Sequence, residues 1–147
     1  MSDSNKQAPQ NLTEAEAAAW VKETFQAANK YLAEQGILSH RILTKESRYV
    51  APVVAIWKFE TNDGKFCWVI NGDLPTDHVG EKAAATARDA MRHFALNWQL
   101  KAEAIFNDNN LANDETQQAY AELLVSRSES LYALSDKNEL WQNEQAS

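Results

Sequence analysis

The sequence is poor in the residues that cross-link small domains or fill long irregular loops. Its 147 residues include one cysteine, four glycines and three prolines. A single thiol, that of Cys67, excludes an intramolecular disulfide and a zinc site built from several cysteines. The low glycine and proline content excludes a collagen-like or low-complexity chain. The chain must therefore fold around an apolar core, for which 44% of its residues are hydrophobic.

Positive charge is also scarce. Lys and Arg number 14 against 21 Asp and Glu, which gives a formal net charge of −7. This balance disfavours binding to nucleic-acid phosphates, so no nucleic-acid partner is expected. The acidity is concentrated near the end of the chain, because residues 113–147 hold seven acidic and two basic residues. We therefore expect any charged partner to bind at the C-terminal segment.

Long apolar runs are missing as well. Residues 1–10 are polar and lack the apolar stretch of a signal peptide, and no segment approaches the roughly 20 apolar residues of a membrane span. We accordingly expect a cytoplasmic protein with no membrane partner. Residues 1–11 offer little apolar surface for packing, and we expect them to be disordered.

Helical signals stand at both ends of the sequence. Residues 13–16, Thr-Glu-Ala-Glu, have the pattern of a capping box, and Gly36 suits the end of the helix that starts there. Residues 84–105 carry apolar side chains at spacings of three and four, which predicts a long helix. Asn113 is predicted to cap a final helix.

The segment between the first two helices is rich in β-branched and aromatic residues. It predicts three strands, at residues 38–50, 53–60 and 65–71. The order of helix, three strands and two helices predicts an α+β fold with a three-stranded antiparallel sheet. Residues 12–110 are expected to form a single α+β domain, and residues 111–147 an acidic helical extension.

The two central strands carry large aromatic side chains. A two-residue turn at Asp63-Gly64 would place Trp57 and Trp68 on the same face of the sheet. Regularly spaced indoles are typical of a core, but they can also line an apolar pocket and offer an N–H donor at its edge. Trp57 and Trp68 are therefore candidates for contacting a ligand as well as core residues.

Polar and ionisable residues are concentrated in the predicted loop at 71–80. Asp73, Asp77 and His78 could supply a carboxylate and an imidazole for acid–base catalysis, or ligands for a metal. The structural alternative is that Asp73 accepts backbone amides in the turn and that Thr76 or Asp77 caps the next helix. Both interpretations of the loop remain open from the sequence.

Motifs of common enzyme classes are missing from the sequence. There is no nucleophile elbow, phosphate-binding loop or dinucleotide fingerprint, and no histidine pair has the spacing of a zinc site. No catalytic residue, metal or cofactor is therefore assigned. Cys67 lies in an apolar run and is interpreted as a small hydrophobic residue rather than a nucleophile.

Several stretches of the chain resemble a bacterial family of small proteins that contain a domain of unknown function. They are residues 49–57, residues 68–78 with the string Gly-Asp-Leu-Pro-Thr-Asp, residues 87–90 and residues 94–98. The resemblance covers residues 18–105 and leaves the last helix outside. It implies no activity, since none is assigned to the family.

Two departures from the family pattern bear on the site. The pattern has Pro-Arg-Glu where this chain has Ala87-Arg88-Asp89, and it has Tyr where this chain has His78. The second departure implies that His78 is not an obligatory metal ligand or general base. Asp73, Asp77 and Arg88 are then the stronger candidates. Arg88 is expected to fold back and pair with one of these carboxylates, or else to form an ordinary surface ion pair.

Taken together, these features predict a non-enzymatic interaction module. It would bind a second copy of itself or another protein through the C-terminal helix. The alternative is a small-molecule-binding protein or enzyme, with its site at the 71–80 loop against the aromatic face of the sheet. A third reading is an acidic chaperone or nucleic-acid mimic, whose binding would weaken with salt.

Overall fold

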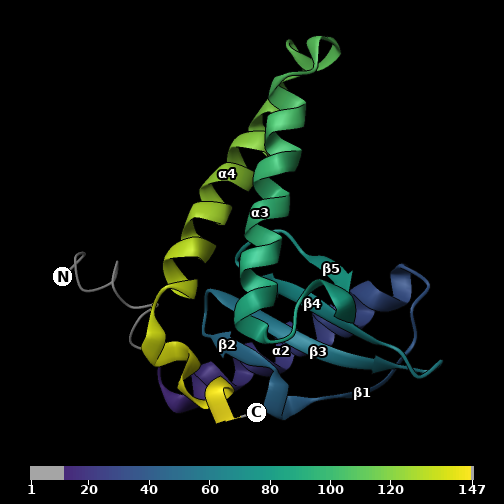
Figure 1. The fold of residues 1–147 in the computed structure, drawn as a ribbon, viewed down its shortest axis with the longest axis vertical. Helices are drawn as coiled ribbons and strands as arrows, with labels where there is room; N and C mark the ends of the chain where they lie inside the picture. The colour runs from purple at the N-terminus through teal and green to yellow at the C-terminus, as the bar shows by residue number, and fades with distance from the viewer. Residues whose placement is uncertain (1–11, 147) are drawn as a thin grey trace. The chain divides into compact units, whose positions relative to one another are not determined.

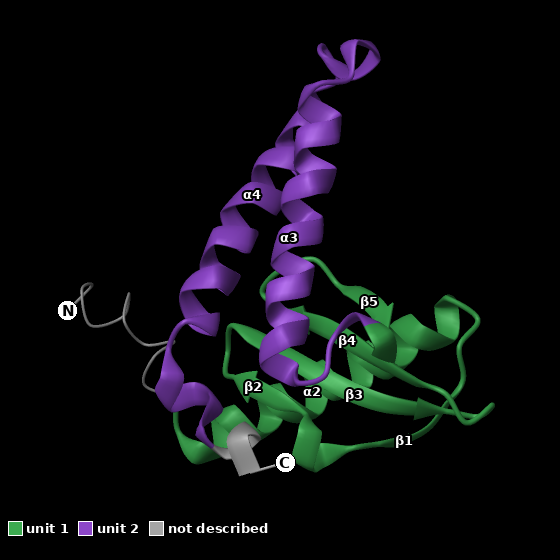
Figure 2. Cartoon of the chain, viewed as in Figure 1, with its two compact units in different colours: residues 1–82 green, residues 83–147 purple. Residues whose placement is uncertain are grey.

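The computed structural model describes residues 12–146, so the disorder expected for residues 1–11 lies outside the described residues. The chain divides into two compact units, residues 1–82 and residues 83–147 (Figures 1 and 2). We call them unit 1 and unit 2. Unit 1 contains one long helix and the sheet, and unit 2 contains two long helices. The predicted division at residue 110 stays a prediction.

The first helix, α2 (Glu14–Glu34), begins and ends at the predicted signals. The backbone N–H of Thr13 donates to Oε1 of Glu16, and the backbone N–H of Glu16 donates to Oγ1 of Thr13, both at 3.0 Å. Gly36 has a φ of 80°, the left-handed conformation that ends many helices. The capping-box prediction is therefore confirmed, because local side-chain chemistry decides both helix ends.

The sheet of unit 1 is antiparallel and has five strands in place of the three predicted. The strand order is β1-β3-β4-β5, and β2 also pairs with β3. The strands are β1 (Ser39–Ile42), β2 (Arg48–Val50), β3 (Val54–Thr61), β4 (Phe66–Gly72) and β5 (Asp77–Gly80). The α+β class is confirmed. The strand count was wrong because the short 3-10 helix η2 (Thr44–Glu46) divides the first predicted strand, and because the end of the predicted loop pairs with β4.

The loop between β3 and β4 decides which side chains share a face. It contains three residues, 62–64, and ends on Gly64, whose φ is 79°. This loop pairs Trp57 with Val69, one residue away from the register of a two-residue turn. A slip of one residue moves a side chain to the other face, so Trp57 and Trp68 lie on opposite faces. The prediction that they share a face was wrong.

Helix α2 packs on one face of the sheet. The Phe25 ring of this helix meets the Trp57 ring edge to face, with 5.6 Å between ring centroids, and stacks on Phe59 at 5.8 Å. The buried core on this face consists of Ala28, Leu32, Ala55, Trp57, Phe59, Cys67 and Val69. The face of β3 and β4 that carries Cys67 is thus directed towards α2.

A buried amide ties this core together. Asn71 is 3% exposed, and its Oδ1 accepts the indole N–H of Trp57 at 2.9 Å. Its Nδ2 donates to the backbone carbonyl of Thr24 in α2 at 2.8 Å. One side chain therefore joins β3, β4 and α2, and it supplies an acceptor for the indole N–H of Trp57, which would otherwise be buried without one.

The chain leaves β4 through a close backbone contact. Gly72 has a φ of 133°, and a Cβ atom at this position would lie 2.5 Å from the carbonyl oxygen of Val53. The next residue, Asp73, donates its backbone N–H to that same oxygen at 2.9 Å. The first residue of the Gly-Asp-Leu-Pro-Thr-Asp string is thus a glycine because a side chain would not fit there.

Unit 2 contains the two predicted C-terminal helices, α3 (Ala87–Phe106) and α4 (Glu115–Ser135). They pack against each other as a helical hairpin (Figure 1). Asp114 caps α4 by accepting the backbone N–H of Gln117, so the prediction that Asn113 caps this helix was wrong by one residue.

Thr86 caps α3 by accepting the backbone N–H of Asp89. The prediction that Thr76 or Asp77 caps this helix was wrong, because the chain first pairs with β4 as β5.

The remaining elements are short 3-10 helices: η3 (Glu81–Ala83), η4 (Asn109–Leu111) and η5 (Asn138–Ala146). Over residues 12–146, no helix combines the length and the apolar character needed to cross a membrane.

Candidate ligand-binding site

Unit 1 contains a cavity of about 530 Å³. Three segments form its wall: the turn after α2, the hairpin loop between β3 and β4 with the start of β4, and strand β5. Small-molecule sites in proteins have volumes of roughly 300 to 1,000 Å³ and mostly apolar walls with a few polar groups. The size of this cavity falls within that range.

The apolar part of the wall comes from the turn and from β4. Ile37 and Leu38 follow the glycine that ends α2, and Phe66 and Cys67 begin β4. Cys67 is 6% exposed, and burial raises the pKa of its thiol to about 11. The thiol is therefore protonated at neutral pH and contributes a weakly polar surface to the wall.

His78 is the imidazole that lines this cavity. It lies on β5 opposite Val69, and therefore on the face of the sheet that packs against α2. Its Nδ1 is 2.7 Å from the hydroxyl oxygen of Tyr31 on α2, and the two rings meet edge to face with 5.4 Å between centroids. Burial, and secondarily the charge of Asp77, raises the pKa of Tyr31, so its hydroxyl keeps its proton.

The two predicted aspartates lie beside this histidine in the chain but do not line the cavity among the described residues. Oδ1 of Asp77 accepts the backbone N–H of His78 at 2.8 Å, which is a local contact at the start of β5. Asp73 is exposed in the turn after Gly72. Roles of Asp73 and Asp77 in catalysis or metal binding stay predictions.

The two predicted tryptophans are both buried. Trp57 is 5% exposed, and its indole N–H donates to Asn71 within the core. Trp68 is fully buried on the other face of the sheet. The structure thus separates these residues from each other, and neither is part of the cavity wall.

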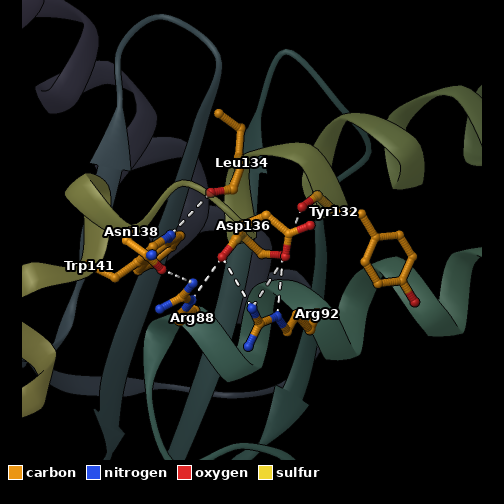
Figure 3. Close-up of polar contacts among 8 residues, drawn as sticks. Arg88, Arg92, Tyr132, Leu134, Asp136, Asn138 and Trp141 are labelled. Atoms are coloured by element: carbon orange, nitrogen blue, oxygen red, sulfur yellow. Dashed lines mark hydrogen bonds and ion pairs between the residues drawn. The ribbon is translucent and has the colours of Figure 1, made fainter.

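Arg88 lies in unit 2, at the start of α3 (Figure 3). Its Nε donates to the backbone carbonyl of Ser135 at 2.7 Å, and its Nη2 donates to Oδ1 of Asn138 at 2.8 Å. Arg92 donates to the same carbonyl at 3.3 Å and forms an ion pair with Asp136 at 3.4 Å. The two guanidinium groups therefore neutralise the C-terminal end of α4, where the helix dipole favours positive charge. Pairing of Arg88 with Asp73 or Asp77 stays a prediction.

A buried lysine was not identified from the sequence. Lys58, on β3, is 6% exposed, and its Nζ lies 2.8 Å from Glu46 and 3.2 Å from Glu81. The same Nζ lies 5.1 Å from the ring centroid of Trp68. Burial alone would lower the pKa of Lys58, but the two carboxylates outweigh burial and raise it. The available signal was a lone lysine within an otherwise apolar strand.

The cavity wall was only partly predictable. His78 was a candidate because it stands among polar residues, whereas Tyr31, Phe66 and Cys67 reach the site through sheet register and helix packing. Counting three residues in the hairpin loop would have placed Cys67 on the same face as Trp57. Within residues 12–146, no group of three or more His, Cys, Asp or Glu side chains is placed to hold a metal ion.

The fold and the cavity define a small α+β protein in which the turn after a helix and one end of a five-stranded sheet line a ligand-sized hollow. A helical hairpin follows in the chain. The chain belongs to the family described as Domain of unknown function (DUF4826), whose family model matches residues 14–141. The match includes α4, so the expectation that the resemblance ends at residue 105 was wrong. No curated protein and no solved structure matches the chain.

Proposed function

We propose that the protein binds a small, mainly apolar molecule in the cavity of unit 1. The observation that carries this proposal is a hollow of about 530 Å³ whose wall combines apolar side chains with one half-buried imidazole. Such a combination is typical of binding sites, in which apolar contact supplies affinity and a few polar groups orient the ligand. The proposal takes up the alternative reading of the sequence, with the site shifted from the centre of the 71–80 loop to its end.

The chemistry of the wall favours binding over covalent catalysis. A nucleophilic cysteine needs a thiolate, and the pKa of about 11 leaves Cys67 almost entirely protonated at pH 7. The hydrogen bond of Nδ1 to Tyr31 leaves His78 with one ring nitrogen for contact with a ligand. The site is therefore proposed to recognise a molecule without forming a bond to it.

A cavity-filling variant tests this proposal. Gly80 lines the cavity, and a Cβ atom added there would meet no other atom within 4 Å, so Gly80→Phe should fill the hollow without straining the backbone. The matched control is Ala119→Phe, at an exposed position of α4. The assay is an amide NMR titration of the ¹⁵N-labelled full chain with aliphatic and aromatic fragments.

We expect fragments to shift the amide signals of Phe66, Cys67 and His78 in the wild-type protein and in Ala119→Phe, and not in Gly80→Phe. Cavity binding would be refuted if no fragment shifted these signals at millimolar concentration. The same conclusion would follow if Gly80→Phe bound as well as the wild type.

We propose as a second candidate function that unit 2 binds another protein or a second copy of the chain. Exposed apolar side chains on the two helices support it, namely Leu96, Leu100, Phe106, Tyr120 and Leu123. Aromatic side chains such as Phe106 and Tyr120 are enriched at protein interfaces, and exposed apolar side chains that lie together mark interaction sites. Size-exclusion chromatography with light scattering, on the full chain and on Leu96→Glu, tests self-association. We expect the wild-type chain to be a dimer and Leu96→Glu to be a monomer. A monomer in both cases would refute the homodimer.

A further inference from the structure

The pairing of His78 with Tyr31 has a consequence for what the cavity can recognise. We infer that Tyr31 holds the neutral His78 ring as the tautomer with its proton on Nε2, so that the cavity selects a small apolar molecule carrying a carbonyl or carboxylate oxygen. This inference rests on the proposed function. It adds the chemical class of the ligand and makes Tyr31 a positioning residue.

The Tyr31 hydroxyl and the His78 ring can each donate only one proton to their shared hydrogen bond. A neutral imidazole has one N–H donor and one nitrogen acceptor, and a phenol donates through its hydroxyl proton. Nδ1 of His78 lies 2.7 Å from the Tyr31 hydroxyl oxygen, close enough for a strong O–H···N bond. If Tyr31 donates, then Nδ1 carries no proton, and the ring proton lies on Nε2.

The surroundings of Tyr31 orient its ring and keep its hydroxyl protonated. The side chain is half-buried on α2, and its edge-to-face contact with the imidazole fixes the relative orientation of the two rings. Burial, and secondarily the carboxylate of Asp77, raises the pKa of Tyr31 and so disfavours the phenolate, which could only accept; the hydroxyl keeps a proton that it can donate to Nδ1. The helix and the strand therefore hold one tautomer through a single contact between side chains 47 positions apart.

The other ring nitrogen of His78, Nε2, is the one left to contact a ligand. The His78 ring lines the cavity, and Nε2 has no hydrogen-bond partner among residues 12–146. A donor N–H beside apolar side chains costs free energy when a ligand displaces water without replacing the hydrogen bond. A carbonyl or carboxylate oxygen satisfies Nε2–H, whereas an ammonium group cannot, because it has no acceptor atom.

The charged groups in the wall agree with this preference. Asp63 and Lys65 lie at the hairpin loop, 4.0 Å apart, and both are largely exposed. The hydroxyl of Thr61 donates to Asp63 and lowers the pKa of its carboxyl group, so this side chain is already engaged. The charges of Asp63 and Lys65 therefore cancel, so the charged side chains in the wall exclude neither a neutral carbonyl ligand nor a carboxylate.

The tautomer can be measured without any ligand. In a long-range ¹H–¹⁵N spectrum of the full chain at pH 8, we expect the His78 Nδ1 signal at the position of an unprotonated nitrogen and the Nε2 signal at that of a protonated one. In Tyr31→Phe we expect a mixture of the two tautomers. The control Tyr120→Phe, on α4, should leave the His78 signals unchanged. Protonated Nδ1 in the wild type would overturn the inference whatever the cavity binds.

The ligand class is tested with three probes of similar size: benzamide, benzoate and benzylammonium. We expect benzamide and benzoate to bind more tightly than benzylammonium in the NMR titration. We expect the affinity for benzamide to fall roughly three- to tenfold in His78→Phe, which keeps a ring but removes the donor. Tyr31→Phe should weaken benzamide binding by less, and the amide spectrum identifies any variant that fails to fold.

The outcomes separate this inference from the proposed function. Equal binding of benzylammonium and benzamide, or unchanged benzamide binding in His78→Phe, would overturn the ligand class while leaving the cavity as a binding site. No binding of any probe, together with no binding of other fragments, would overturn the proposed function itself.

Discussion

Removing the amide of Asn71 should destabilise unit 1 by about 2 to 4 kcal/mol. In Asn71→Ala, the indole N–H of Trp57 would stay buried without its acceptor, which costs about 1 to 3 kcal/mol. The carbonyl of Thr24 would lose its side-chain donor, although α2 still supplies a backbone donor to it. The void left by the shortened side chain adds about 1 kcal/mol.

This loss is measurable by urea unfolding of the full chain. With a denaturant slope of about 2 kcal/mol/M, the midpoint should move down by about 1 to 2 M. The matched background is Trp57→Phe, which has no indole N–H to leave unpaired. In that background, Asn71→Ala should cost at least 1 kcal/mol less. A cost below about 0.5 kcal/mol, or the same cost in both backgrounds, would refute the reasoning.

Three further positions, the buried Cys67 and Lys58 and the strained Gly72, also give testable predictions. Cys67 should react with iodoacetamide at pH 8 at least about a hundredfold more slowly in the native than in the urea-unfolded chain, because burial raises its pKa from 9.0 to about 11; comparable rates would contradict this. The unfolded thiol ionises first, so Cys67 should also lower stability as the pH rises from 9 to 11, and Cys67→Ala should remove that part of the loss. Lys58 has a raised pKa, so its contribution to stability should be complete below pH 10.5 and be lost as the pH rises above it. At pH 7, the free energy of unfolding of Lys58→Met should stay within about 1 kcal/mol of the wild-type value, since both glutamate partners can regain water. A loss above about 3 kcal/mol would contradict this. Gly72→Ala should cost about 2 kcal/mol or more in urea unfolding, whereas Gly80→Ala should cost less than about 0.5 kcal/mol, and equal costs would show that the contact with Val53 is not limiting.

The parts of the fold that depend on neighbouring residues were predictable from the sequence. The side chains of the capping box of α2 lie within three residues of the backbone groups that they satisfy, and Gly36 directly follows the last residues of the helix. These local features set the bounds of the helix. The long apolar stripe likewise predicted α3, since the period of a helix is visible in any window of that length.

The parts that depend on pairing were not predictable in the same way. One extra residue in the loop at 62–64 reversed the face assigned to Trp68, and nothing local to Trp68 reports that count. Strand β5 forms because residues 77–80 pair with β4. Their own sequence resembles a turn and does not predict a strand. Tyr31 and His78 are 47 positions apart in the sequence, and their hydrogen bond is formed only by the packing of α2 on the sheet. The sequence therefore did not indicate this contact of the candidate site.

The arginine contacts at the end of α4 bear on how this protein can change in evolution. Arg88 and Arg92, in the first turns of α3, both hold the carbonyl of Ser135, so the beginning of one helix depends on the end of the other. A gene that lost its last codons would leave two guanidinium groups and an apolar helix face without their partner. We expect the two helices to be inherited, lost or transferred together. Length variation among homologous genes should then fall in the polar turn at 107–114, which joins α3 and α4 at the other end of the hairpin (Figure 1).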